Sequence, residues 1–242
     1  MNKNQIISIV NQENTGMKRS EINKYQKDAV CFLKKHNFLL PAWTFWTGEE
    51  WRQKTGSDYD EIKECNLGWD ITDFGSGEFE KIGLLLFTIR NGRLDNDKYK
   101  KIYAEKIMIV GVDQITPTHF HWKKSEDIIN RGGGDLKVQV WKATEDEKLS
   151  EEPFTVQMDG IRVAVMPGQI LTLKPGDSIT MEPYIYHNFY SKKEKTLVGE
   201  VSAVNDDTND NRFYTPAGRF PEIEENEPLL YPLCTEYKHI CG

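Results

Sequence analysis

The spacing of apolar residues divides the chain into a short helical part followed by a long β part. Apolar side chains recur at helical intervals at Ile22, Tyr25, Ala29, Phe32 and Leu33. This pattern predicts an amphipathic helix over residues 20–38, which Ser20 can cap. A Thr-x-x-Glu capping-box pattern at residues 47–50 predicts a second, short helix that stops near Gly56.

From about residue 67 the helical spacing fades, and short β-rich runs alternate with Gly, Pro and Asp turns. We predict strands over residues 82–90, 104–110, 117–122, 136–142, 161–166, 169–174, 178–182, 185–190 and 196–204. Many short strands at this spacing favour an all-β core of the sandwich or jelly-roll barrel type. Residues 205–242 are acidic and irregular, and we interpret them as a long C-terminal extension that wraps the barrel.

Nothing in the sequence marks a linker that would separate a second domain. We therefore interpret residues 1–16 as an N-terminal extension, residues 17–66 as a helical segment packed on the barrel, and residues 67–242 as a single barrel domain with its C-terminal wrap. The longest mostly apolar run, residues 82–89, is far shorter than the ~20 residues that a membrane-spanning helix needs. The N-terminus lacks a secretory pattern and no cysteines form a Cys-x-x-Cys pair, so we expect a cytoplasmic protein with reduced thiols.

The charge balance argues against two classes of partner. Lys and Arg number 31 against 38 Asp and Glu, which gives a formal net charge of −7. Nucleic-acid binding needs a basic footprint for the phosphates, and attachment to anionic lipid needs basic clusters. We therefore expect neither a nucleic acid nor a membrane as a partner.

The stretch around His119 carries the clearest candidate chemistry. Side chains alternate between the two faces of a strand, so His119 and His121 point the same way while Phe120 points the opposite way. Two imidazoles at this spacing can reach one metal ion, and a tight turn can bring the Glu126 carboxylate to the same point. A later turn, strand and Pro-bearing turn lead to a further histidine, His187.

Together with Gly133, Gly176 and Pro183, these residues resemble the two sequence motifs of the cupin family. The resemblance implies a small jelly-roll β-barrel that holds a divalent metal with three histidines and one glutamate. Carried over by position, the metal ligands are His119, His121, Glu126 and His187. Three nitrogens and one oxygen without a thiolate suit Mn²⁺, Fe²⁺, Co²⁺, Ni²⁺ or Zn²⁺ and leave coordination positions open for a substrate.

Longer stretches resemble one group of cupins, the D-lyxose ketol-isomerases. The similarity covers most of residues 17–237 and is carried by the segments 67–77, 83–92, 103–109, 126–134, 198–202 and 219–225. It implies a metal-dependent aldose–ketose isomerase that interconverts D-lyxose and D-xylulose, with D-mannose and D-fructose as a side activity. It further implies manganese as the metal, a small-molecule sugar as the partner and a homodimeric assembly.

Such a reaction moves hydrogen between C1 and C2 of the sugar. A divalent ion bound to both sugar oxygens would stabilise the charge of an enediolate, and a positioned carboxylate would relay the proton. A hydride shift is the alternative route that the sequence leaves open.

Glu200 and Lys106 are candidates for proton transfer and sugar binding. Glu200 shares one face of the predicted strand 196–204 with Val198 and Ser202, so it enters the pocket if that face lines the barrel. The alternative is an ordinary solvent-facing glutamate. Lys106 is a charge inside an apolar strand, which is costly unless it is paired or functional. We interpret it as a pocket cation that binds sugar oxygens, with an outward-facing edge lysine as the alternative.

Two acids of the C-terminal tail, Asp210 and Glu222, can fold over the barrel mouth as a base and a hydroxyl-binding group, or lie on the surface as ordinary acids. Arg219 is a further candidate for binding sugar oxygens. Two other functions also fit the metal ligands: an iron-dependent cupin dioxygenase, and a non-catalytic cupin that only binds sugar.

Overall fold

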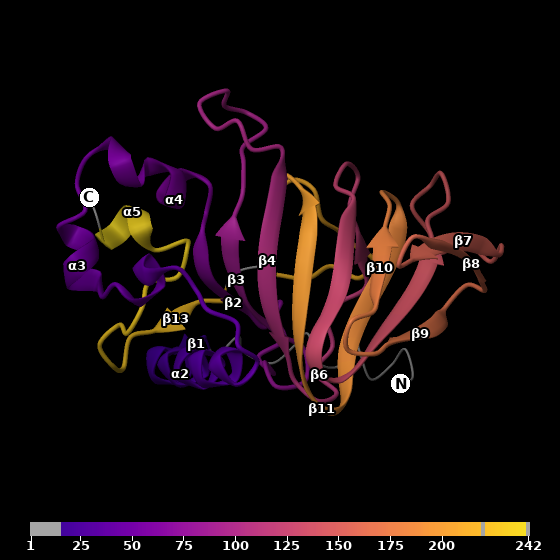
Figure 1. The fold of residues 1–242 in the computed structure, drawn as a ribbon, viewed down its shortest axis with the longest axis horizontal. Coiled ribbons are helices and arrows are strands. Elements are labelled where there is room, and N and C mark those ends of the chain that lie inside the picture. The colour runs from indigo at the N-terminus through magenta and orange to yellow at the C-terminus, as the bar shows by residue number, and fades with distance from the viewer. Residues whose placement is uncertain (1–15, 219–220, 241–242) are drawn as a thin grey trace.

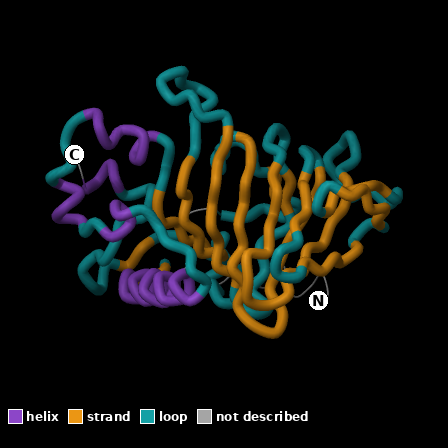
Figure 2. Tube along the Cα trace, viewed as in Figure 1, coloured by secondary structure: helices purple, strands orange, loops and turns teal. Residues whose placement is uncertain are grey.

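The computed structural model describes residues 16–218 and 221–240. An antiparallel β-structure forms its main body, and the helices gather at one end of it (Figures 1 and 2). The helices are α2 (Arg19–Lys35), α3 (Gly48–Arg52), α4 (Asp60–Glu64) and α5 (Tyr237–Ile240), with 3₁₀ turns at Ala42–Phe45 and Ser57–Tyr59. Within the described residues, no helix is long and apolar enough to cross a membrane. Of the predicted N-terminal extension, residues 1–15 lie outside the described residues.

The first predicted helix is confirmed as α2, with two corrections. It ends at Lys35 instead of residue 38, and Lys18 takes the N-cap position that we predicted for Ser20. The backbone N–H of Lys18 donates to the carboxylate of Glu21 at 3.0 Å, which satisfies one of the groups left open at a helix start.

The second predicted helix is confirmed as α3, although it ends before Gly56. Its capping box is present: the Glu50 N–H donates to the Thr47 hydroxyl at 3.3 Å, and the Thr47 N–H donates to the Glu50 carboxylate at 2.8 Å. The third helix, α4, follows soon after and was not predicted.

The strands form one large antiparallel sheet and one small parallel pair. The large sheet has the order β2-β3-β4-β11-β6-β10-β7-β8, while β5, β9 and β12 pair off this path. Its strands are β2 (Gly68–Thr72), β3 (Leu84–Arg90), β4 (Tyr103–Val110), β5 (His119–Phe120), β6 (Glu126–Lys142), β7 (Phe154–Met158), β8 (Ile161–Val165), β9 (Gln169–Leu173), β10 (Ser178–Met181), β11 (Ile185–Ala203) and β12 (Arg212–Phe213). The parallel pair joins β1 (Met17–Lys18) to β13 (Ile223–Glu224). The predicted all-β core is therefore confirmed.

Two long strands, β6 and β11, run side by side through this structure (Figure 1). The segments 185–190 and 196–204, predicted as separate strands, form the single strand β11. Its first part also pairs with β5 and its second part with β4, so β11 connects the two halves of the barrel. The pairing of β6 with β11 is irregular between Lys192 and Thr196. Gly133 lies at this point with φ +93°, and a Cβ there would overlap the carbonyl oxygen of Lys195.

Strand β3 explains why a continuous apolar run appears in the sequence. Leu84 and Leu86 face the interior of the barrel, whereas Leu85 and Phe87 face the helix α2. Both faces of this strand are buried, so hydrophobic and polar residues do not alternate along it. The same reason applies to β2, which is buried throughout and was not predicted as a strand.

The C-terminal segment returns to the start of α2. The guanidinium of Arg19 is 1% exposed and forms ion pairs with Glu225 and Glu236. Asn23 adds hydrogen bonds to the same segment, donating to the Pro228 carbonyl at 2.9 Å and accepting from the Leu230 N–H at 3.0 Å. Residues 221–240 are therefore fixed against the helical end of the molecule.

Candidate functional site

Three histidines meet at one place in the barrel. In the sheet register, His119 on β5 faces His187 on β11 directly, and their ring centroids lie 4.4 Å apart. His121 follows β5, with its ring centroid 5.1 Å from that of His119 and 5.8 Å from that of His187. Phe120 points the opposite way, fully buried among other aromatic rings. The alternation predicted for this strand is therefore confirmed.

Backbone carbonyls hold all three imidazoles through the same ring nitrogen. Nδ1 of His119 lies 2.9 Å from the Pro117 carbonyl oxygen, Nδ1 of His121 lies 2.8 Å from that of Asp210, and Nδ1 of His187 lies 3.0 Å from that of Ile185. With Nδ1 donating, each ring presents the lone pair of Nε2.

The Nε2 atoms are available to a cation. Within the described part of the chain, Nε2 of His121 and Nε2 of His187 are buried and have no hydrogen-bond partner. One ligand nitrogen from each of His119, His121 and His187 lies within 4.8 Å of the others. Unpaired buried polar atoms are costly unless something else satisfies them, and a bound metal ion would do so. This histidine group could therefore hold a metal ion.

Glu126, the first residue of β6, lies beside this histidine group. Its Oε1 is 3.1 Å from Nε2 of His187, and its Oε2 is 3.4 Å from Nε2 of His121. The side chain is almost fully buried. The structure therefore brings together all four residues that the cupin resemblance names, His119, His121, Glu126 and His187.

The electrostatic setting favours metal-binding forms of these groups. Burial, followed by the neighbouring rings of His187 and His121, holds the pKa of His119 well below its ordinary value, so this ring is neutral near pH 7. Burial alone would raise the pKa of Glu126, but Lys124 and His121 outweigh it and hold that pKa well below its ordinary value. The site thus presents a neutral imidazole and an ionised carboxylate.

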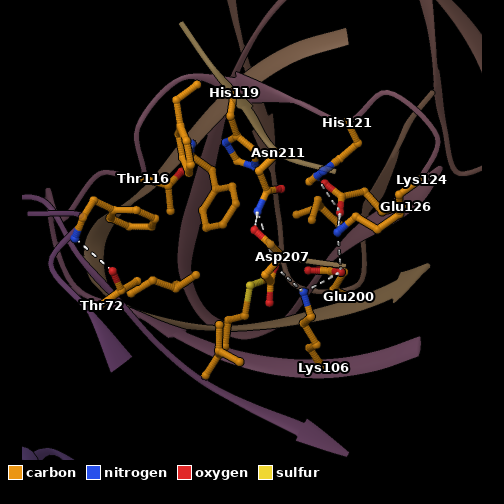
Figure 3. Close-up of a pocket in the computed structure, with 17 residues that line it drawn as sticks. Thr72, Lys106, Thr116, His119, His121, Lys124, Glu126, Glu200, Asp207 and Asn211 are labelled. Carbon is orange, nitrogen blue, oxygen red and sulfur yellow. Dashed lines mark hydrogen bonds and ion pairs between the residues drawn. The ribbon is translucent and has the colours of Figure 1, made fainter. Parts of the chain in front are cut away.

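Lysines and acids alternate along one wall of the pocket (Figure 3). Lys124 Nζ lies 2.5 Å from Oε2 of Glu126 and 3.0 Å from Oε1 of Glu200. Lys106 Nζ lies 3.3 Å from the same Glu200 oxygen and 3.7 Å from Oδ1 of Asp207. Four of the five residues are buried, and Asp207 is partly buried. Burial lowers the pKa of Lys124, but Glu126, Glu200 and Asp207 outweigh it and raise that pKa above its ordinary value.

Segment 205–213 of the predicted tail closes one side of this pocket. Asp207, Asn211 and Phe213 line it, and Asn205 accepts hydrogen bonds from both pocket lysines. Strand β12 holds the segment in place by pairing with β5. The Asp210 carboxylate does not line the pocket: it accepts from the backbone N–H groups that follow Trp122, at 2.9 Å each.

The remaining predicted residues lie elsewhere. Glu222 is exposed, and its carbonyl oxygen accepts from the Met17 N–H at 2.7 Å beside the parallel strand pair. The structure does not bring it to the pocket, because the tail pairs with residues 17–18 directly after this residue and then binds to α2. Arg219 lies outside the described residues.

Sequence reasoning missed Lys124, Asp207 and Asn211. Lys124 follows Lys123 in a stretch whose sequence is typical of an exposed turn. Only the two-residue spacing between Lys124 and Glu126 indicates that these two side chains point the same way. Asp207 and Asn211 lie in an Asn- and Asp-rich run, where the unusual loop length was the one available signal. The opposite pocket wall is apolar and aromatic, with Phe74 and Phe213 at a centroid distance of 5.9 Å.

Comparison with known structures shows where this architecture recurs. An L-ribose isomerase from Cellulomonas parahominis, solved with L-ribose, superposes with a TM-score of 0.58 at 16% identity, covering 88% of this chain and 100% of that one. An L-ribose isomerase mutant from Acinetobacter sp. DL28, also with L-ribose, gives a TM-score of 0.59 at 14% identity, with coverage of 88% and 100%. At these identities the likeness establishes the fold.

The sequence comparisons are more specific. A D-lyxose/D-mannose isomerase from Escherichia coli O157:H7 is 44% identical over 224 residues, which are 92% of this chain and 99% of that protein. One from Serratia proteamaculans is also 44% identical, over 91% of this chain and 98% of that protein. The family model described as D-lyxose isomerase matches residues 17–237. This chain is a sugar isomerase and belongs to the D-lyxose isomerase family.

Proposed function

We propose that this enzyme interconverts D-lyxose and D-xylulose, and D-mannose and D-fructose as a side activity, at a divalent-metal site held by His119, His121, Glu126 and His187. One observation carries the proposal: three imidazoles, each held at Nδ1 by a backbone carbonyl, bring one ligand nitrogen each to within 4.8 Å of the others, and the Glu126 carboxylate lies beside two of them. The relatives from E. coli O157:H7 and S. proteamaculans, named for D-lyxose and D-mannose, support the substrate class.

The donor set fits a divalent ion of the Mn²⁺, Fe²⁺, Co²⁺, Ni²⁺ or Zn²⁺ group, of which we propose Mn²⁺. When bound, such an ion would supply Lewis-acid polarisation of the sugar oxygens at C1 and C2. Among the described residues, Thr116 and the aromatic wall also line the pocket, so one side of a sugar can meet apolar surface while the other meets charged groups.

Glu200 is the residue that we propose for proton transfer between C2 and C1. It is buried in the pocket wall, and both neighbouring lysines contact the same oxygen, Oε1. The second oxygen, Oε2, can then take a proton from C2 and return it to C1 through an enediol. The two ammonium groups fix the orientation of the carboxylate through Oε1.

Lys106 and Asn211 are proposed to bind the sugar hydroxyls. Both line the pocket and contact Asp207, and both carry N–H donors suited to sugar oxygens. Asp210 is proposed as a positioning residue, because its carbonyl holds His121 and its carboxylate holds the following turn.

The test is an aldose panel run with metal-stripped protein and with protein reloaded with one metal at a time. D-Lyxose, D-mannose, L-ribose and D-xylose would be compared by the ketose formed. We expect conversion of D-lyxose to be fastest, to vanish on stripping and to return with Mn²⁺. Equal conversion by folded, metal-stripped protein would refute the metal dependence, and a clear preference for L-ribose would refute the substrate.

Running the reaction in D₂O separates the two possible routes. A proton relay through Glu200 places solvent deuterium at C1 of D-xylulose, because the carboxylate can exchange its proton before it is returned. A hydride shift transfers hydrogen directly and leaves C1 unlabelled. Absence of label at all stages of conversion would remove the proposed role of Glu200.

A further inference from the structure

Lys124 occupies an unusual place for a lysine. It lies between His121 and β6, and its side chain is 2% exposed. The backbone N–H of Lys124 donates to Oδ2 of Asp210 at 2.9 Å. This hydrogen bond holds the backbone of the residue in place. Its neighbour Lys123 has the same N–H contact to Asp210 through Oδ1, yet Lys123 is exposed.

The partners of Lys124 belong to two different parts of the proposed chemistry. Its ammonium group contacts Oε2 of Glu126 on β6 and Oε1 of Glu200 on β11, as Figure 3 shows. It also donates to Oδ1 of Asn205 at 3.2 Å. One buried cation therefore joins a proposed metal ligand to the proposed base.

The two acids depend on Lys124 to different degrees. Glu200 also has Lys106 at 3.3 Å, so it keeps one cation if Lys124 is removed. For Glu126, Lys124 is the lysine in contact within the described part of the chain, and its other side-chain neighbours in these contacts are the imidazoles of His121 and His187. A buried carboxylate that loses its cation turns toward other donors, and this change removes it as an oriented ligand.

We propose that Lys124 is a positioning residue that holds Glu126 as a metal ligand and Glu200 as a base in one fixed relation. This inference rests on the proposed metal site. It predicts that removal of the Lys124 ammonium group weakens metal binding itself, whereas removal of the Glu200 charge does not. Outer partners of metal ligands commonly change metal affinity about 10–100-fold when they are replaced.

The experiment measures metal binding without turnover. Metal-stripped wild type and the variants Lys124→Met, Lys124→Gln, Glu200→Gln and Lys123→Met would be titrated with Co²⁺, following its visible absorption, and with Mn²⁺ by calorimetry. Lys123→Met is the matched control, because it removes the adjacent exposed lysine side chain. Circular dichroism of the metal-stripped proteins would check the fold, and Lys124→Gln, which keeps N–H donors without the charge, carries the test if Lys124→Met does not fold.

We expect Lys124→Met to lose about 10–100-fold in affinity for both ions and to show an altered Co²⁺ spectrum. Glu200→Gln and Lys123→Met should stay within about threefold of wild type, because neither removes a partner of Glu126. Wild-type affinity and spectrum in the folded Lys124 variant would overturn the role of Lys124. Failure of wild type to bind either ion would instead overturn the proposed metal site, so the two failures are distinguishable.

Discussion

Glu200 on β11 and Lys106 on β4 face each other directly across an antiparallel strand pair, with 3.3 Å between Oε1 and Nζ. Each is a charged residue about as buried as the aliphatic side chains around it. Buried charges persist when they are paired or used, and here the pair lies in the wall of the pocket. The register of two strands thus places a candidate base beside a candidate sugar-binding cation.

Replacing Glu200 with Gln should reduce turnover while leaving the metal site filled. The amide keeps the shape of the side chain but cannot take the C2 proton, so we expect kcat to fall about 10²- to 10⁴-fold. Steady-state kinetics on D-lyxose, with metal content measured on the same samples, checks this. Glu194→Gln, a change at an exposed position of the same strand, is the control and should retain wild-type kcat.

Replacing His121 or His187 with Ala should remove the stabilisation that metal gives. A ligand that binds only the folded state adds about 2.7 kcal/mol when its concentration is 100 times its Kd. Adding Mn²⁺ should therefore raise the melting temperature of stripped wild type, and this shift should disappear in either variant. The exposed His239 offers a control: His239→Ala should keep the full shift.

Asp210→Ala should destabilise the fold and impair activity together. The change leaves the N–H groups of Lys123 and Lys124 without their acceptor, and the buried N–H of Lys124 alone should cost about 1–3 kcal/mol. The free energy of unfolding from urea denaturation measures it. Asp97→Ala removes an exposed acid and should change stability little; an equal effect of both variants would contradict the assigned role of Asp210.

Two cysteines should differ sharply in their rate of reaction with alkylating reagents. Cys31 is exposed, whereas Cys65 is 1% exposed. Burial, together with Glu61, raises the pKa of Cys65 to about 11. Because the thiolate is the reactive form, iodoacetamide at pH 8 should label Cys31 in the native protein and Cys65 only after unfolding in urea. Peptide mass spectrometry identifies the labelled site, and native labelling of Cys65 at the rate of Cys31 would contradict this assignment.

Gly133→Ala should cost more stability than Gly160→Ala. Both glycines have positive φ, which costs other L-residues about 1–2 kcal/mol. At Gly160 nothing lies within 4 Å of an added Cβ, whereas at Gly133 the Cβ would overlap the Lys195 carbonyl oxygen. Urea unfolding of both variants compares them, and equal losses would show that β11 can move aside without cost.

The fold class and the site histidines could be predicted because they depend on local patterns. The even spacing of His119 and His121 fixes their direction on a strand, and the capping box at Thr47 needs only four consecutive residues. Three histidine nitrogens and one glutamate oxygen, with no cysteine thiolate, then indicate a site for a divalent metal ion. These features do not depend on knowing which strands pair.

The rest depends on pairing between distant segments. Lys124 contacts Glu200 only because the sheet brings β11 beside it, and nothing near Lys124 in the sequence indicates that contact. Glu222 was placed over the pocket because the path of an irregular tail cannot be predicted from its composition. The ion pairs of Arg19 with that tail decide its path, and they join residues more than 200 positions apart.

His187 and Glu200 belong to a single strand, β11, and the irregular stretch between Lys192 and Thr196 lies between them. A one-residue insertion or deletion in that stretch would reverse the facing of every later side chain, sending Glu200 outward while His187 stayed in place. Relatives that keep the same chemistry are therefore expected to conserve the length of this stretch more strictly than its amino-acid identities, and length variation should accumulate in loops outside the β6–β11 pair.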